Sequence, residues 1–204
     1  MPEDFAGQDL SGKNLVNADL TGANLTGANL TRADLTGANL TRADLTGANL
    51  TGAKLPSANL ARANLTGANL TGADLDSADL NHAYIGWAKL PGADLTGADL
   101  TEANLLQAKL PGADLTGANL RWATLHNADL NGANLTDANL QSAKFWIGYF
   151  TPDLLEIYSS GVPHNAGADL TGADLTGADL TGADLRGAIL TGVVGADFTG
   201  AKLE

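Results

Sequence analysis

Apolar residues recur at every fifth position along most of the chain. From Leu10 to Leu140 each of these positions holds Leu, with Ile85 as the single exception. The position two residues before each one is Ala throughout, from Ala18 to Ala143. In its commonest form the unit therefore reads Ala, Asp or Asn, Leu, Thr, Gly.

A period of five fits neither a straight helix nor a straight strand. In an α-helix a step of five residues rotates the side chain by about 140° net, which would spread the Leu side chains around the axis. In a strand an odd step sends successive Leu side chains to opposite faces. A chain that turns once per unit keeps Leu and Ala inside, Asp or Asn outside, and Thr-Gly at the bend. The period therefore predicts a solenoid, although Ala and Leu individually favour helix.

A near-identical block indicates how many units close one coil. Residues 88–97 recur almost unchanged as residues 108–117, twenty positions later. Four units per coil would stack the two blocks directly and sort the outward residues into columns. The predicted columns are Asp74, Asp94 and Asp114; Asp79 and Asp99 on the next face; Lys89 and Lys109 on another; and Arg42, Arg62, His82, Glu102 and Trp122 at a corner, with Tyr84 and Trp87 near them.

The repeats resemble the pentapeptide repeat family, whose motif is A(D/N)LXX. The resemblance covers residues 5–150 and 166–203. It implies an all-β fold, a right-handed four-sided β-helix of about nine coils. Because the family shares a scaffold rather than an activity, function has to be argued from the outward residues.

The repeat lapses from Trp146 to Asn165, where Gly148 and Tyr158 occupy positions that elsewhere hold Ala. Thr151 and Pro152 are typical of a helix start, so we predict a short helix from Pro152 to Ser159 in a loop that leaves the solenoid. Two interpretations stay open, a packing elaboration and a partner-binding loop. We expect one domain over residues 1–204, with a main solenoid at 5–145, the loop at 146–165 and carboxyl-terminal coils at 166–203.

The carboxyl-terminal units end in a slip of register with no obvious polar capping helix. Solenoids need their terminal coils covered, and relatives of this family often dimerise at this end. We therefore expect Leu190, Val193, Val194 and Phe198 to face a second subunit. A short closing strand or the end of a fragment is the alternative.

Composition narrows the classes of function. The 204 residues carry a net charge of −12, which argues against nucleic acid as a direct partner. No apolar run approaches the roughly 20 residues of a membrane span. The first residues lack the basic and apolar regions of a signal peptide, so we expect a cytoplasmic protein.

Candidate chemistry is sparse. The chain has no Cys, and its three His residues, His82, His126 and His164, share no metal-ligand spacing. An interior filled by Leu and Ala leaves no apolar pocket for a substrate. We expect no enzymatic activity, no cofactor and no metal.

The resemblance implies a protein partner, because some members are proposed to imitate duplex DNA, bind DNA gyrase or topoisomerase IV and protect them from quinolones. A rod of about nine coils is roughly 43 Å long, and duplex DNA of that length carries about 25 charges, against −12 here. Half of the net charge lies in residues 151–204, so we expect mimicry to use these coils and the Asp74–Asp114 face. The residues predicted to bind the partner are Asp74, Asp79, Asp94, Asp99, Asp114, Asp169, Asp174, Asp179, Asp184, Tyr84, Trp87, Trp122, Trp146, Leu154 and Tyr158.

The competing hypothesis is a scaffold or interaction protein unrelated to topoisomerases, docking through Trp87, Trp122, Tyr84 or the loop. Salt separates the two, because binding by DNA mimicry weakens steeply with ionic strength. Ice binding by Thr columns is disfavoured, since Pro91, Pro111 and other residues interrupt them. An engineered consensus scaffold is disfavoured by the irregular loop.

Overall fold

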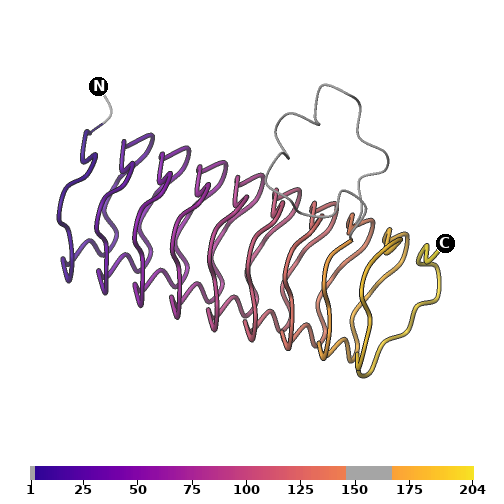
Figure 1. The fold of residues 1–204 in the computed structure, drawn as a ribbon. Coiled ribbons are helices and arrows are strands. Elements are labelled where there is room, and N and C mark those ends of the chain that lie inside the picture. The colour runs from indigo at the N-terminus through magenta and orange to yellow at the C-terminus, as the bar shows by residue number, and fades with distance from the viewer. Residues whose placement is uncertain (1–2, 146–166) are drawn as a thin grey trace, which may run out of the picture.

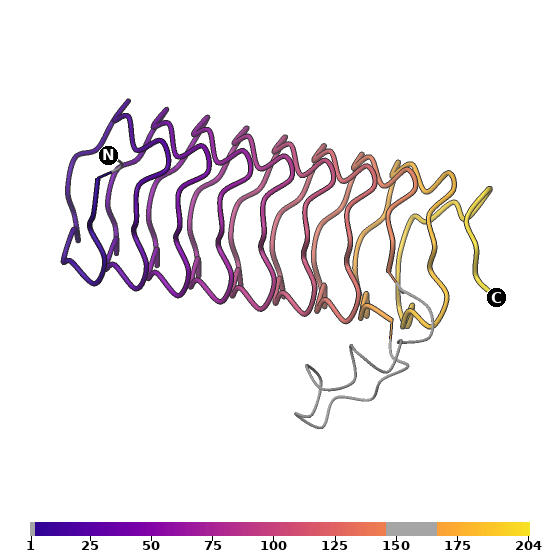
Figure 2. The same cartoon turned by 90° about the horizontal axis from the view of Figure 1, so that it is seen from above.

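The protein is a right-handed four-sided β-helix, described here for residues 3–145 and 167–204 of a computed structural model. Its coils stack in sequence order from the amino-terminal to the carboxyl-terminal end (Figures 1 and 2). Each side of a coil is a short extended segment centred on one bridging residue, followed by a two-residue turn. Within the two described ranges the β-structure consists of isolated parallel bridges, and no helix occurs there.

The register is four units per coil, as the sequence predicts. Asp74 bridges Asp94, and Asp94 bridges Asp114, each pair twenty residues apart. Two hydrogen bonds make each bridge: the Leu95 N–H donates to the Asp114 carbonyl at 2.7 Å, and the Asp114 N–H donates to the Ala93 carbonyl at 3.0 Å. This pattern repeats on every side, so the backbone ladders run the length of the rod.

The register continues past the undescribed residues and slips near the end. Asp129 bridges Asp169, so the coils on either side of residues 146–166 stack on one another. In the final coil Asp184 bridges Lys202, eighteen residues on. The predicted helix at Pro152–Ser159 lies outside the described residues.

The core is the ladder of Leu and Ala that the period predicts. The inward Leu and Ala side chains of the repeat from Leu20 to Ala143 are buried, and Phe145 fills the same position at the end of the series. Towards the two ends the burial is incomplete, as at Phe5 and Leu190. Burying one Leu side chain stabilises a fold by about 1.5–3 kcal/mol, so the inward residues set the stability while the outward residues are left for function.

The turns explain the polar residues of the repeat. The Leu95 carbonyl accepts a hydrogen bond from the Ala98 N–H at 3.0 Å, and Gly97 between them has φ of 64°. The Asp or Asn before each Leu accepts a bond from the N–H two residues on, as Asp94 Oδ1 does from Thr96 at 3.0 Å. Asp and Asn share the slot because each supplies this acceptor.

No helix in the described part of the chain has the length and apolar character to cross a bilayer.

Candidate functional site

The bridges divide the outward residues into four columns, one on each face of the rod. The first face presents Asp4, Asn24, Asp44, Asn64, Tyr84, Asn104, Thr124, Lys144, Asp184 and Lys202. The second presents Asp9, Asn29, Asn49, Asn69, Lys89, Lys109, Asp129, Asp169 and Ile189. The third presents Asn14, Asp34, Lys54, Asp74, Asp94, Asp114, Asn134, Asp174 and Val194. The fourth presents Asp19, Asn39, Asn59, Asp79, Asp99, Asn119, Asn139 and Asp179.

Acidic residues gather where the third face meets the fourth. We name this group the acidic edge; its members are Asp74, Asp76, Asp79, Asp94, Asp99 and Asp114. Both predicted Asp columns belong to it, and the structure places them side by side across one corner. Asp76, which sequence reasoning did not single out, occupies the turn between them. It could have been found from the sequence, because it is an acidic residue at a repeat position that usually holds Thr.

The acidic edge is dense in charge. Three coils occupy about 14 Å of the axis, and duplex DNA of that length carries about eight charges. The edge presents six carboxylates there, and residues 74–79, 94–99 and 114–119 contain no Lys or Arg. Its charge therefore approaches that of DNA more closely than the average over the whole rod does.

Hydrogen bonds to the turns hold these carboxylates in place. Asp114 Oδ1 accepts from the Thr116 N–H at 3.0 Å and from the Thr116 hydroxyl at 2.6 Å. Asp99 makes the same pair of bonds with Thr101, at 3.0 Å and 2.5 Å. The carboxylates are thus fixed through one oxygen, and their charge remains at the surface of the rod.

Lys54 and Arg121 flank the acidic edge. Lys54 precedes Asp74 in the column of the third face. Arg121 lies further along the rod, and its positive charge helps to lower the pKa of Asp179. Beyond the edge, acidic residues continue on the same corner as Asp137, in the turn between Asn134 and Asn139, and as Asp174 and Asp179 in the next coil.

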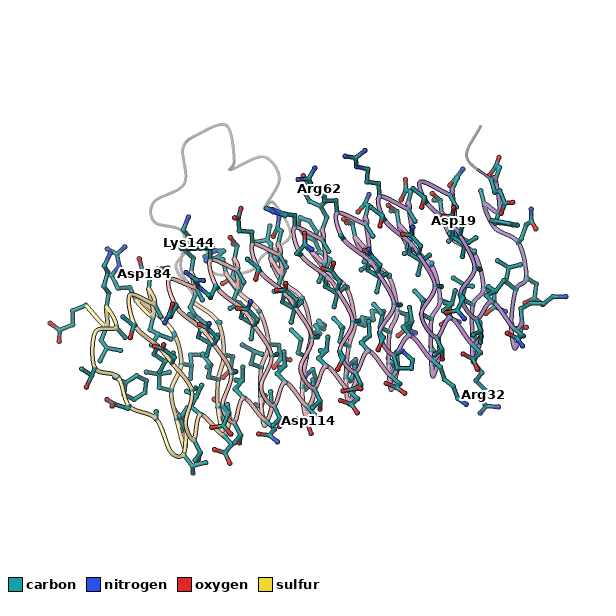
Figure 3. All side chains as sticks on the ribbon, turned by 180° about the vertical axis from the view of Figure 1, so that it is seen from behind. Asp19, Arg32, Arg62, Asp114, Lys144 and Asp184 are labelled. Carbon is teal, nitrogen blue, oxygen red and sulfur yellow. The ribbon has the colours of Figure 1, made fainter. Side chains whose placement is uncertain are left out.

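The carboxyl-terminal Asp residues do not form a single surface. Asp174 and Asp179 extend the third and fourth columns, whereas Asp169 lies on the second face and Asp184 on the first. Figure 3 shows Asp184 on the opposite side of the rod from Asp114. Of the four, only Asp174 and Asp179 lie in the columns of the Asp74–Asp114 face, and their role in binding a partner stays a prediction.

Hydrogen bonds lower the pKa of these two carboxyls. The Thr176 hydroxyl and N–H lower the pKa of Asp174, while the Thr181 N–H and the Gln141 amide lower that of Asp179. Their negative charge therefore persists to lower pH than that of a free Asp.

Aromatic side chains lie away from the acidic edge. Trp87 stands at the corner between the first and second faces, diagonally opposite the acidic edge, and is 43% exposed. Tyr84 lies on the first face, 57% exposed. Trp122 stands at the corner between the fourth and first faces, 46% exposed, with the Arg121 guanidinium 4.3 Å from its ring centre. We name Tyr84, Trp87, Lys89 and Lys109 the aromatic edge.

The predicted corner column that includes Trp122 is formed. Successive N–H groups of Arg42, Arg62, His82, Glu102 and Trp122 donate to carbonyls of the next coil at 2.9–3.0 Å. Within it, His82 Nδ1 lies 3.4 Å from Glu102 Oε2.

Both exposed Trp residues occupy a backbone conformation that ordinarily favours Gly. Trp87 and Trp122 each have φ of 57°, and twelve further non-Gly residues of the described chain share this region. At the same corner as Trp87, the preceding coils have Gly47 and Gly67. An L-residue in this conformation is strained by about 1–2 kcal/mol. The backbone conformation of these two Trp residues therefore lowers the stability of the folded protein.

His126 is a buried residue that sequence reasoning did not single out. It occupies the turn position that Leu106 takes one coil earlier, and its side chain is fully buried. Burial lowers the pKa of this imidazole, since desolvation disfavours the charged form. A polar residue in a turn gives no sequence signal of burial.

The predicted dimer end is partly covered. Leu190, Val193 and Phe198 pack against the core with partial exposure, and Val194 is 53% exposed. Dimerisation through this end stays a prediction. Trp146, Leu154 and Tyr158 lie outside the described residues.

No group of three His, Cys, Asp or Glu side chains in residues 3–145 and 167–204 is arranged to hold a metal ion.

Comparison with known proteins gives the family. A model of pentapeptide repeats, in eight copies, matches residues 4–37, 14–52, 43–81, 78–117, 118–146 and 166–192. The chain belongs to the pentapeptide repeat family. Among curated proteins no significant match is found.

Two solved structures of pentapeptide repeat architecture are similar to this solenoid. HetL, a protein involved in heterocyst differentiation regulation from the cyanobacterium Nostoc sp. strain PCC 7120, is 33% identical, with a TM-score of 0.50 over 98% of this chain and 87% of HetL. A trypsin-treated form of QnrB1, a plasmid-mediated fluoroquinolone resistance protein, is 20% identical, with a TM-score of 0.55 over 100% of this chain and 91% of that chain. At that identity the likeness to QnrB1 concerns the fold alone.

Proposed function

We propose that this pentapeptide repeat protein is a non-enzymatic binding protein whose acidic edge takes the place of duplex DNA in the cationic groove of a protein, with a type II topoisomerase as the partner. Binding there protects gyrase or topoisomerase IV from quinolone-type inhibitors. We place the protein in the cytoplasm, as a dimer through its carboxyl-terminal coils.

The charge density of the acidic edge carries the proposal. Six carboxylates in three coils, with no Lys or Arg in residues 74–79, 94–99 and 114–119, offer a cationic groove a potential similar to that of a short stretch of DNA. Complementary potentials steer association and suppress wrong partners.

The rigidity of the edge supports the proposal further. Each carboxylate stands on a bridged coil, and Asp99 and Asp114 are tied to turn Thr residues. Charges that are already placed lose little side-chain entropy on binding. The fold of QnrB1, a fluoroquinolone resistance protein, is consistent with such a role.

A second candidate function is a regulatory interaction protein unrelated to topoisomerases. Its support is the exposure of Tyr84, Trp87 and Trp122, since Trp and Tyr dominate binding energy at protein interfaces. HetL, with 33% identity, is described as involved in the regulation of differentiation.

A supercoiling assay tests the proposal. Purified protein is titrated into DNA gyrase with and without a quinolone, and we expect inhibition of supercoiling or relief of quinolone inhibition. The effect should weaken steeply as ionic strength rises. Unchanged gyrase activity and quinolone sensitivity at about micromolar protein, where specific protein pairs are ordinarily bound, would exclude it.

If gyrase does not respond, the second function makes a different prediction. Binding through the aromatic side chains depends on buried area and is little affected by salt.

A further inference from the structure

The aromatic edge and the acidic edge are opposite in charge and lie at diagonally opposite corners of the same stretch of rod. Residues 84–89 and 104–109 carry Lys89 and Lys109 and contain no carboxylate. Residues 74–79, 94–99 and 114–119 carry six carboxylates and no base. The rod therefore has a transverse charge separation that its net charge conceals.

The two edges also differ in the size of the side chain at their corners. Trp87 projects from its corner, with its indole Nε1–H donating to Gln107 Oε1 at 3.1 Å, which fixes the ring. The corner of the acidic edge is bare, because Gly97 and Gly117 stand there in successive coils. A Cβ built on Gly117 meets no atom within 4 Å, and one on Gly97 meets only the Ser77 hydroxyl at 3.5 Å.

The spacing of the charges is common to both edges. Lys89 and Lys109 lie one coil apart, as do Asp74, Asp94 and Asp114. The coil rise of about 4.8 Å is the same in every copy of the chain. When two copies lie side by side, Lys residues of one therefore stay in step with the Asp residues of the other.

From these observations we infer that the occupant of the aromatic edge is a second copy of this chain, which docks there through its acidic edge. Trp87 of one copy lies over the Gly corner of the other, with Lys89 and Lys109 beside the Asp column. The Debye length of about 8 Å at physiological salt screens the repulsion between the net charges, while direct Lys–Asp contacts are screened less.

The contact is heterologous, because each copy uses a different edge towards each neighbour. Because the two edges lie at diagonally opposite corners of the rod, successive contacts extend in a line instead of closing a ring, and both outer edges stay free to add further copies. The docked copy covers the acidic edge, so self-association and a cationic partner exclude each other. The inference itself rests on the two edges and stands whether or not the proposed topoisomerase function holds.

Sedimentation velocity of the full chain at about 100 μM, a range suited to weak protein contacts, tests the inference. We expect concentration-dependent association at an ionic strength of about 0.15 M, where the repulsion between the net charges is screened, and its loss at about 0.5 M. Lys89→Asp with Lys109→Asp should weaken the association at least tenfold. The fold tolerates this exchange, since Asp129 occupies the same column.

Charge reversal of the acidic edge is the second part of this experiment. Asp94→Lys with Asp114→Lys, in a column that accommodates Lys54, should also abolish association. An equimolar mixture of this variant with the Lys89→Asp, Lys109→Asp variant should restore hetero-association, because complementary edges are again present. Lys54→Asp lies outside the aromatic edge and makes the same charge change as Lys89→Asp alone, so these two single variants form the matched pair.

Several results would overturn the inference. These are the absence of association at an ionic strength of about 0.15 M, equal weakening by Lys54→Asp and Lys89→Asp, or failure of the mixture to associate while both variants retain the wild-type circular dichroism spectrum. Association that is removed by Val194→Asp and unaffected by the edge variants would assign the contact to the carboxyl-terminal end instead.

Discussion

The acidic edge and the aromatic edge are built on the same coils, yet they offer a partner opposite surfaces. Beneath both run the same buried Leu and Ala side chains and the same bridges. The differences lie in the outward slot and the two turn positions of each unit. In this solenoid the fold and the surface are therefore specified by different residues, and a surface can change without a change of fold.

The same comparison shows what the aromatic edge demands of the fold. Gly97 and Gly117 adopt positive φ at the acidic corner without a side chain, whereas Trp87 adopts φ of 57° with a large one. Strained residues persist where the surrounding structure holds them, and they cluster at functional sites. Because Ser77 adopts φ of 55° at the acidic corner as well, the conformation belongs to the turn, and the role of Trp87 has to be argued from its exposure.

The largest effect on stability that we predict concerns the core that the two edges share. Leu95 and Leu105 are fully buried and lie beside the acidic and the aromatic corner, respectively. Leu95→Ala and Leu105→Ala should each lower the free energy of unfolding by about 2–5 kcal/mol. Urea denaturation measures both free energies of unfolding. If only one variant were destabilised, the core would support the two edges unequally.

The second prediction concerns His126, which is buried near the aromatic edge. Its pKa is lower in the folded than in the unfolded chain, so its contribution to stability is complete above pH about 6.5 and is lost as pH falls towards the folded pKa. We expect the free energy of unfolding to fall by up to about 1.4 kcal/mol per pH unit in that window.

His126→Leu is the matched variant, because Leu106 occupies the same turn position one coil earlier. It should remove the slope that begins below pH about 6.5 and leave a separate acid transition. That transition reflects carboxyls such as Asp174 and Asp179, whose lowered pKa makes their contribution vanish only below pH about 3.8. A wild-type slope in the variant would exclude His126 as its source.

Our third prediction concerns the exchange of Gly and Trp between the corner of the acidic edge and the corner of the aromatic edge. Gly117→Trp should destabilise the protein by about 1–2 kcal/mol, because the corner keeps its positive φ and the ring finds no neighbour. Trp87→Gly should stay within about 1 kcal/mol of wild type, since relief of strain offsets the lost contact area. Thermal unfolding followed by circular dichroism compares the two, and a large loss in Trp87→Gly would make that residue structural.

The smallest effect on stability should come from neutralising the acidic edge. Asn occupies the same slot in the same columns, and Asn134 Oδ1 accepts from the Thr136 N–H at 3.1 Å, as Asp114 does from Thr116 at 3.0 Å. Asp99→Asn and Asp114→Asn should each change the free energy of unfolding by less than about 0.5 kcal/mol. Urea denaturation checks this, and a larger loss would show that these charges serve the fold.

The sequence predicted the core, the turns and the register because one short period governs all three. Ala93 and Leu95 must point inward for every coil to close, and the repeated block at residues 88–97 and 108–117 identifies the coil length. The columns of Asp74–Asp114 and of Lys89 and Lys109 follow from that register alone. The regularity of the chain made these residues predictable.

Residues outside the period were harder to place. The four-unit register puts Asp169 and Asp184 on different faces, but the interruption after Phe145 hides which earlier column each one joins. The burial of His126 and the diagonal placement of Trp87 depend on how corners pack, which a linear repeat does not encode. These are also the residues through which two members of the family with one fold can differ.

The most direct test of the central claim compares two triple variants of equal net charge in the gyrase supercoiling assay. Asp94→Asn, Asp99→Asn and Asp114→Asn remove three of the six charges of the acidic edge, while Asp44→Asn, Asp129→Asn and Asp169→Asn remove the same charge from the first and second faces. We predict that the acidic-edge variant needs at least about tenfold more protein for half of the wild-type effect, equivalent to about 1.4 kcal/mol, and that the control stays within about twofold. Equal shifts in both variants, or none in either, would contradict a function that depends on the acidic edge.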